Sequence, residues 1–252
     1  MIEALAPAFI GPFVYFARTA VLPDDPRPRI NAGEFFEGPA LIRSLELAQQ
    51  RYPGGHRDAV TALWARGYAA KVVPVSLAAS LILNRNLPVD IDQLELALGD
   101  DGASPAAIVV GTIGEPVTSL DAFARFARLI HGHLEPAVDA LATRGRASRK
   151  VLWGDLALYI DYFLRASTEI TDRPVGSFAF DPSRLVTARL LPDGRTNSLF
   201  QPRTVVTTPE GPALHRKTCC RSYRLGGDNQ PCLDCPIQTK NERRAECSRD
   251  AA

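Results

Sequence analysis

Apolar residues recur every three or four positions over much of the first two thirds of the chain, which is the period of an amphipathic α-helix. Runs of this kind cover residues 41–51, 58–73, 75–83, 119–134, 136–145 and 148–163. The pattern therefore predicts a mainly helical body that extends to about residue 173.

Residues that cap or break helices mark several boundaries of these runs. Asp58 and Ser148 stand where helix N-caps are expected, and Thr118 or Ser119 can cap the run that follows them. Pro74 is expected to end or kink its helix, because proline lacks the N–H group and clashes with the preceding turn. Residues 58–83 are accordingly predicted to form a helical hairpin.

The pattern changes in the last third of the chain. Residues 184–191 alternate between apolar and polar positions as a β-strand does, and residues 196–208 are rich in β-favouring side chains. The Pro-Asp-Gly sequence at residues 192–194 is a turn signal between them. A short strand is also expected earlier, at residues 106–110, whereas residues 22–38 hold many turn formers and are predicted to be an irregular loop.

These elements predict an α+β protein in three parts. Residues 1–173 form the helical body, residues 174–214 form a β-rich segment, and residues 215–252 hold every cysteine of the chain. A chain of 252 residues with 46% hydrophobic residues is long and apolar enough to bury a sizeable core.

Charge and composition narrow the class of protein. The net charge is only +1, so no overall field favours nucleic acid as a partner, although residues 211–252 carry eight Lys and Arg against five Asp and Glu. Glu3 stands where a signal peptide needs basic residues, and Pro7 and Pro12 interrupt the apolar run at the N-terminus. No membrane-spanning segment is expected, and we predict a soluble cytoplasmic protein with reduced thiols.

The cysteines form two close pairs and one isolated residue. Cys219 and Cys220 are adjacent, eleven residues follow, and Cys232 and Cys235 then form a C-x-x-C pair. A disulfide framework is typical of short secreted chains with an even number of cysteines, and this chain has five. The spacing favours a metal site with four thiolate ligands, and Cys247 is expected not to be a ligand.

Four thiolates suit either structural zinc or an iron–sulfur cluster. Zinc sites usually take both sulfurs of a C-x₂₋₄-C knuckle on a single ion. Neighbouring side chains in extended backbone point to opposite faces, so Cys219 and Cys220 more readily reach two different metal atoms. The residues alone place a [2Fe–2S] cluster ahead of zinc and leave both open.

The cysteine segment resembles the FhuF-like ferric-siderophore reductases, whose C-terminal Cys-Cys, about ten residues and Cys-x-x-Cys hold a [2Fe–2S] cluster. The resemblance rests on His-Arg-Lys-Thr-Cys-Cys-Arg-Ser-Tyr-Arg-Leu at residues 215–225 and Cys-Leu-Asp-Cys-Pro at residues 232–236. Val-Leu-Trp-Gly-Asp-Leu-Ala at residues 151–157 is similar to a Leu-Trp-Gly-Asn segment of that family, with Asp155 in place of Asn. The loop between the pairs is one residue longer than usual, and the role of Asp155 is open.

The resemblance implies a cytoplasmic oxidoreductase that reduces chelated Fe³⁺ to Fe²⁺ through a [2Fe–2S] cluster and so releases iron from a siderophore. It implies Cys219, Cys220, Cys232 and Cys235 as the iron ligands, a ferric siderophore of hydroxamate type as the first candidate substrate, and docking against the helical body. Peripheral association with the inner membrane is compatible with this role. The alternatives are a zinc-stabilised binding module without redox activity and a bare electron carrier.

The source of electrons and the attraction of substrate involve other residues. The sequence holds no GxGxxG motif after a strand and no P-loop, so electrons are expected from a partner protein such as a ferredoxin or a flavin reductase. Arg216, Lys217, Arg221 and Arg224 flank the first cysteine pair and are expected to attract an oxygen-rich chelate or an acidic donor.

Overall fold

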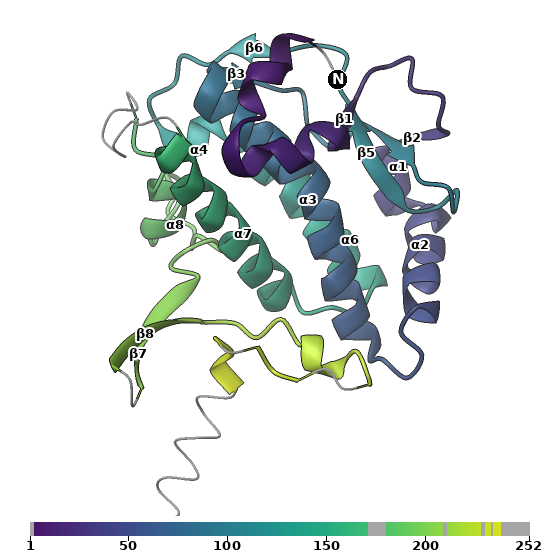
Figure 1. Ribbon diagram of the computed structural model, residues 1–252, viewed down its shortest axis with the longest axis vertical. Coiled ribbons are helices and arrows are strands. Elements are labelled where there is room, and N and C mark those ends of the chain that lie inside the picture. The colour runs from purple at the N-terminus through teal and green to yellow at the C-terminus, as the bar shows by residue number, and fades with distance from the viewer. Residues whose placement is uncertain (1–2, 171–179, 209–210, 228–229, 233, 238–252) are drawn as a thin grey trace, which may run out of the picture.

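The computed structural model describes residues 3–170, 180–208, 211–227, 230–232 and 234–237. Helices form most of it, and short strands form three small sheets, so the protein has the predicted α+β fold. The change of character expected at residues 174–176, and Cys247, lie outside the described residues. Figure 1 shows the helices side by side above the C-terminal segment, which crosses their lower ends.

The longest helix, α3 (Arg57–Leu83), runs through the centre of the helical body and packs against α7 (Arg149–Ile170) (Figure 1). Pro74 lies inside α3 without ending it, so the predicted helical hairpin is wrong. By length and composition α3 could cross a membrane, but 67% of its most apolar window is buried inside the protein. Its apolar character reflects its central place in the core.

Two further helices lie before α3 in the chain. Helix α2 (Pro39–Gln50) confirms the run predicted at residues 41–51. Helix α1 (Ala32–Glu37) occupies part of the segment predicted as an irregular loop, and that prediction is wrong there. Asn31 caps α1 by accepting a hydrogen bond from the Glu34 N–H group. Because Phe35 and Phe36 are buried in the core, packing forms this short helix despite its turn-rich surroundings.

The helices between α3 and α7 follow one another almost without a break. They are α4 (Ala122–Arg125), α5 (Ala127–Leu129), a π-helical turn η3 (Ile130–Leu134) and α6 (Glu135–Arg144). The N-cap of α4 is Asp121, which accepts from the Ala124 N–H group, rather than the predicted Thr118 or Ser119.

The strands are short and lie mainly at one end of the helical body. One sheet has the order β1-β5-β4-β2, and β5 confirms the strand predicted near residues 106–110. Its strands are β1 (Ala20–Val21), β2 (Arg29–Asn31), β4 (Glu95–Leu98) and β5 (Pro105–Val109). A second sheet pairs β3 (Arg85–Asn86) with β6 (Glu115–Pro116). The N-terminal 3₁₀ segments η1 (Glu3–Ala8) and η2 (Gly11–Thr19) pack against α3.

The segment that leads to the cysteines is less regular than predicted. Residues 184–187 form a short helix, α8 (Arg184–Thr187), so the strand expected at residues 184–191 is wrong. Leu185 and Val186 are both buried, which one turn of helix allows and a strand with alternating faces does not. A hairpin of β7 (Arg203–Thr208) and β8 (Gly211–Arg216) then brings the chain to the first cysteine pair.

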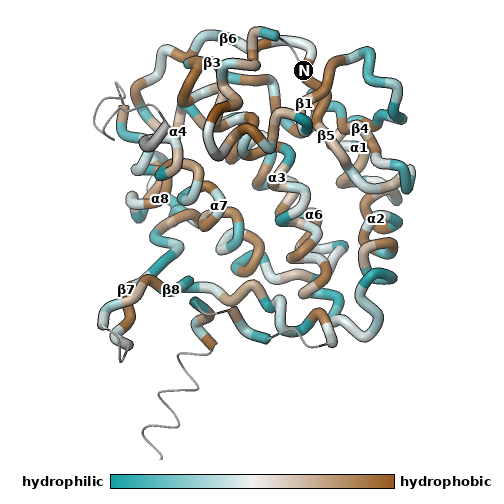
Figure 2. Tube along the Cα trace, viewed as in Figure 1, coloured by the Kyte–Doolittle hydropathy of each residue, from teal (hydrophilic) through white to brown (hydrophobic). Residues whose placement is uncertain are grey.

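The distribution of apolar residues explains how the parts hold together. In Figure 2 the apolar stretches lie mainly on the helices, and many hydrophilic residues lie in peripheral loops. Phe163 of α7 stacks on Phe13 of η2 with ring centroids 5.0 Å apart, and Tyr159 and Phe16 contact the same ring edge-on. Aromatic pairs of this kind stabilise a core beyond their buried area.

A buried histidine forms a polar contact inside this core. His133 Nδ1 donates to the Val89 carbonyl at 2.6 Å, so Nε2 accepts from the Tyr68 hydroxyl at 2.7 Å. Both side chains are almost fully buried. Burial lowers the pKa of His133 to about 4, because the charged imidazolium would lose its hydration.

The low pKa of His133 predicts a loss of stability in mild acid. His133 takes up a proton near pH 6.5 in the unfolded chain and only near pH 4 in the native protein. Between these pH values the unfolded state therefore binds more protons. The free energy of unfolding is therefore expected to fall by about 2 kcal/mol from pH 7.5 to pH 5 through this residue. Urea unfolding of the wild type and of His133→Gln at both pH values checks this, since the variant should lack that share of the pH dependence. An equal dependence in both proteins contradicts it.

Candidate metal centre

The cysteine segment lies against the N-terminal ends of α3 and α7, where Figure 1 shows the yellow end of the chain. The His56 N–H group, just before α3, donates to the Arg224 carbonyl at 2.9 Å. On α7, a Cβ atom at Gly154 would lie 2.7 Å from the Thr218 Cβ. A glycine at this position lets the backbone just before Cys219 approach the helix closely.

The structure brings together cysteines from both pairs. Cys219 Sγ and Cys235 Sγ lie 3.5 Å apart, although they are 16 positions apart in the chain. Cys220 and Cys235 are buried, and Cys219 and Cys232 are half-buried. A hydrogen bond from the Cys235 N–H group to the Cys232 carbonyl, at 2.9 Å, closes the turn between those two residues.

The sulfur positions are compatible with a soft metal. Two thiolates on one tetrahedral ion lie about 3.8 Å apart when each metal–sulfur bond is about 2.3 Å, and the Cys219–Cys235 distance is close to this. Within the described ranges, no three His, Cys, Asp or Glu side chains are gathered closely enough to hold a single metal ion. One cysteine from each pair meets across the site, which is compatible with a single ion as well as with two metal atoms.

A buried ion pair joins α7 to the cysteine segment. Arg216 donates to Asp155 Oδ1 at 2.6 Å, and the two side chains are only 11% and 5% exposed. The other terminal nitrogen of Arg216 lies 3.9 Å from Cys232 Sγ. Burial raises the pKa of Asp155 even though Arg66 and Arg216 both lower it. Asp155 therefore orients a cation toward the Cys232 sulfur without contacting the sulfur itself.

A second arginine connects α3 with the other end of the site. Arg66 donates to Ser222 Oγ at 3.0 Å, and Ser222 Oγ lies 3.0 Å from Cys220 Sγ. The Nε atom of Arg66 lies 3.8 Å from Asp155 Oδ2, so Asp155 stands between Arg66 and Arg216. Arg66 thus places a positive charge near Cys220 Sγ, where the negative charge of a thiolate would form on metal binding.

The thiols respond differently to these surroundings. Burial would raise the pKa of Cys220, but the hydrogen bonds of Ser222 and the charges of Arg216 and Arg66 hold it below its usual value. Burial raises the pKa of Cys219 to about 12 despite the Arg221 N–H group that donates to its sulfur at 3.3 Å. Burial and the neighbouring Cys220 also raise the pKa of Cys232.

The cysteine segment is also attached to the first turn of α3. Asp58, which the sequence suggested as an N-cap, instead lies in that first turn and accepts hydrogen bonds from Arg221 and Arg224, the latter at 2.8 Å. Arg224 further contacts His56 Nδ1 at 2.7 Å. A carboxylate in the first turn of a helix is also favoured by the helix dipole.

The basic residues expected to attract substrate thus have partners within the chain. Arg216 is buried beside Asp155, and Arg221 and Arg224 pair with Asp58. Lys217 donates to Gln201 at 3.1 Å and lies over the Phe200 ring. Their role toward substrate stays a prediction, whereas their structural contacts were not foreseen.

Sequence reasoning missed Arg66, Ser222 and Asp58 as neighbours of the site. The sequence does single out Asp155, which replaces a neutral residue in the Leu-Trp-Gly segment, but it assigns that residue no role. Arg66 gives no sequence signal, since it is one arginine among many on a helix and only the tertiary fold brings it to Ser222.

Comparison with known proteins addresses the family of the chain. The sequence model described as ferric iron reductase FhuF-like transporter matches residues 62–208, which is more than half of the chain and ends before the cysteines. The chain is also 29% identical over 178 residues to the ferric siderophore reductase of Escherichia coli (strain K12). That alignment covers 70% of this chain and 64% of the relative, so the chain spans just under two thirds of its length.

The matched region contains α3 and α7, with Arg66 and Asp155, and the cysteine segment follows it. The family match therefore rests on the helical scaffold that supports the site and is independent of the cysteine spacing. We conclude that the chain belongs to the FhuF-like ferric iron reductase family.

Proposed function

We propose that the protein reduces ferric siderophores by one electron and so releases Fe²⁺, with a [2Fe–2S] cluster held by Cys219, Cys220, Cys232 and Cys235. The observation that carries the proposal is the meeting of the two cysteine pairs across 16 positions, at 3.5 Å between Cys219 and Cys235, on the scaffold of a ferric reductase family. The E. coli relative is named as a ferric siderophore reductase.

The donor set suits an iron–sulfur cluster. Thiolates are the usual ligands of such clusters, which when bound exchange single electrons. Cys219 and Cys235, whose sulfurs lie 3.5 Å apart, would hold one metal atom of such a cluster, and Cys220 and Cys232 would be left to hold the other. This arrangement relaxes the demand that adjacent cysteines converge on a single ion.

The surrounding residues are arranged to hold a negatively charged group. Arg216 lies close to Cys232, and Arg66 reaches Cys220 through Ser222, so cations are present on both sides. Charge and hydrogen bonds near the sulfurs raise the potential of an iron–sulfur site, and burial of Cys220 and Cys235 limits solvent access. Asp155 fixes Arg216 and moderates its charge.

The reaction balances with one electron for each iron. Chelated Fe³⁺ gains an electron and becomes Fe²⁺, which oxygen-rich ligands hold less tightly because it is the softer ion. We propose that the electron comes from a partner protein such as a ferredoxin or flavin reductase, that the protein works in the cytoplasm, and that it meets its substrate there or beside the inner membrane.

Spectroscopy on anaerobically isolated protein tests this function. We expect a red-brown protein whose visible absorption bleaches on addition of dithionite and returns on addition of a ferric siderophore, with Fe²⁺ formed in equal amount. A colourless protein with bound zinc would instead support a zinc-stabilised binding module.

The electron source has a separate test. NADPH alone is expected to leave the isolated protein oxidised, while NADPH with an added ferredoxin and its reductase should reduce it. Oxidation of NADPH by the purified chain without any added protein would contradict the proposed dependence on a partner.

A further inference from the structure

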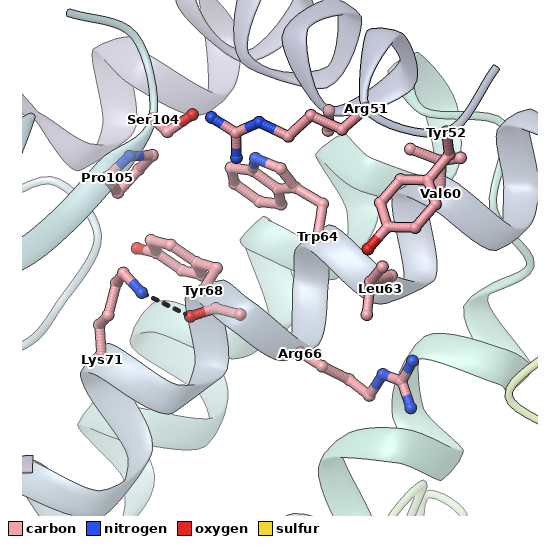
Figure 3. Close-up of a pocket in the computed structure, with 12 residues that line it drawn as sticks. Arg51, Tyr52, Val60, Leu63, Trp64, Arg66, Tyr68, Lys71, Ser104 and Pro105 are labelled. Carbon is pink, nitrogen blue, oxygen red and sulfur yellow. Dashed lines mark hydrogen bonds between the residues drawn. The ribbon is translucent and has the colours of Figure 1, made fainter. Parts of the chain in front are cut away.

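A groove lies beside the candidate metal centre, between the C-terminal end of α2, the first half of α3 and the start of β5 (Figure 3). It has a volume of about 520 Å³, which is within the range of small-molecule sites. The lining residues that matter below are Arg51, Tyr52, Trp64, Arg66, Gly67 and Lys71.

Three basic residues line the groove. Arg51, Arg66 and Lys71 line it, and its lining includes no Asp or Glu. Arg51 pairs with Asp101 and Arg66 with Asp155, both outside the lining. Lys71 Nζ donates to the Gly67 carbonyl of its own helix at 2.9 Å, and in the described part of the chain it makes no ion pair (Figure 3). Burial and the nearby Arg18 lower the pKa of Lys71, so an anion bound beside it would stabilise its charged form.

Aromatic side chains form much of the wall. Trp64 stacks on Tyr68 with ring centroids 5.5 Å apart and planes 7° from parallel. The Trp64 Nε1–H group donates to Ser44 Oγ at 2.9 Å, which fixes the orientation of the indole. Rigid aromatic faces beside cations suit an anion that carries flat aromatic rings, because one ring can stack on the wall while the negative charge meets the cations.

Gly67 leaves the α3 side of the groove bare. It lies in the interior of α3, where glycine destabilises a helix relative to alanine. A Cβ atom built at this position would meet nothing within 4 Å, so no packing within the described structure requires glycine. The missing side chain keeps the space above the helix open.

Arg66 connects the groove to the cysteines. It lies at the edge of the groove and donates to Ser222 Oγ, which contacts Cys220 Sγ. Figure 3 shows Arg66 pointing away from Trp64 and Lys71, toward the cysteine segment. A ligand in the groove is therefore separated from a cysteine ligand by two side chains.

We propose that this groove is the binding site of the ferric chelate and that it takes an anionic complex, such as a tris-catecholate, in preference to a neutral tris-hydroxamate. The inference rests on the proposed function and departs from the hydroxamate substrate expected from the sequence. Lys71 and Arg51 bind the negative charge, the half-buried Trp64 indole, which also stacks on Phe35 and Tyr68, contacts a ligand ring, and Gly67 gives the ligand room.

Binding of a chelate that cannot be reduced tests the groove separately from electron transfer. Gallium(III) tris-catecholate has the charge of the ferric complex, and its affinity for the anaerobically isolated full-length protein can be measured by calorimetry. Gly67→Leu fills the groove and Lys71→Met removes one of its cations. Lys150→Met is the matched control, since Lys150 is an exposed lysine in a second groove of about 560 Å³ along α7.

We expect Gly67→Leu and Lys71→Met each to weaken gallium tris-catecholate binding at least tenfold, as the loss of a contact to a charged group does. Lys150→Met should bind as the wild type does. Gly67→Leu should melt at or above the wild-type temperature, because leucine favours the helix, which separates a blocked site from a damaged fold. The wild type should bind gallium tris-hydroxamate at least tenfold more weakly than the tris-catecholate.

Unchanged affinity in Gly67→Leu, or a loss confined to Lys150→Met, would overturn the groove as the binding site. Equal affinity of the wild type for both gallium complexes would overturn the preference for anions. Either result leaves the proposed function standing if the cluster spectrum and iron reduction persist. If no cluster spectrum is found, the proposed function fails whatever the groove binds.

Discussion

Replacement of Cys235 by serine is expected to abolish the visible absorption of the proposed cluster and the proposed reduction of ferric siderophores. Cys235 is fully buried, and its sulfur lies 3.5 Å from Cys219 Sγ, so a serine oxygen would stand where a soft thiolate is required. Iron content for each chain and the visible spectrum after anaerobic isolation measure the effect.

Cys247→Ser is the matched control for this experiment. Cys247 lies outside the described residues, and the sequence predicts that it is not a ligand. The variant should keep the iron content and spectrum of the wild type. If Cys235→Ser retained the full spectrum, or if Cys247→Ser lost it, the assignment of the four ligands would be wrong.

Asp155→Ala should cause the largest loss of stability of any single change of charge near the site. It would leave Arg216, whose side chain is 11% exposed, without its carboxylate partner. Removing one member of a buried ion pair typically costs about 3–5 kcal/mol, because the remaining charge stays out of water. Urea unfolding of the isolated protein, followed by circular dichroism, measures the change.

Two variants separate the buried charge from a general effect of removing a carboxylate. Glu95→Ala breaks the exposed pair with Arg29, at 3.0 Å, and should cost less than about 1 kcal/mol. Asp155→Asn keeps a hydrogen-bond acceptor for Arg216, so its loss of stability should lie between those of Asp155→Ala and Glu95→Ala. Asp155→Ala no more costly than Glu95→Ala would show that the pair does not stabilise the fold.

The same two variants bear on the potential of the site. Asp155→Asn removes a negative charge that compensates Arg216, so the site becomes more positive and its reduction potential should rise. Glu95 lies in β4, in a different sheet from the β7–β8 hairpin that leads to the cysteines, so Glu95→Ala should leave the potential unchanged.

Local patterns predicted the long helices because their apolar period is strong. Residues 41–51 and the helix after Ser148 were found in this way. Pro74 was misjudged, since burial of α3 on most sides stabilises the helix through a residue that would break an isolated one. α1 and α8 are single short helices in polar or alternating sequence, and tertiary packing of Phe35, Phe36 and Leu185 decides them.

The candidate site divides in the same manner. The cysteine spacing alone predicts the four candidate ligands. The Leu-Trp-Gly-Asp segment singles out Asp155. The contacts of Arg66 with Ser222 and of Asp58 with Arg224 join residues more than 150 positions apart, so no local pattern can reveal them. The groove likewise exists only after α2 has packed on α3. The division into residues 1–173, 174–214 and 215–252 stays a prediction.

The attachment of the cysteine segment has a consequence for how the protein matures. Its anchors, Asp58 and Asp155, belong to the two long helices that pack on each other, whereas the thiols belong to the end of the chain. During synthesis α3 and α7 emerge first, so Asp58 and Asp155 are already in place when Arg216, Arg221 and Arg224 follow. For the proposed cluster, we expect iron and sulfide to be inserted into a nearly finished protein, so that starvation for iron leaves a folded apoprotein that can be refilled.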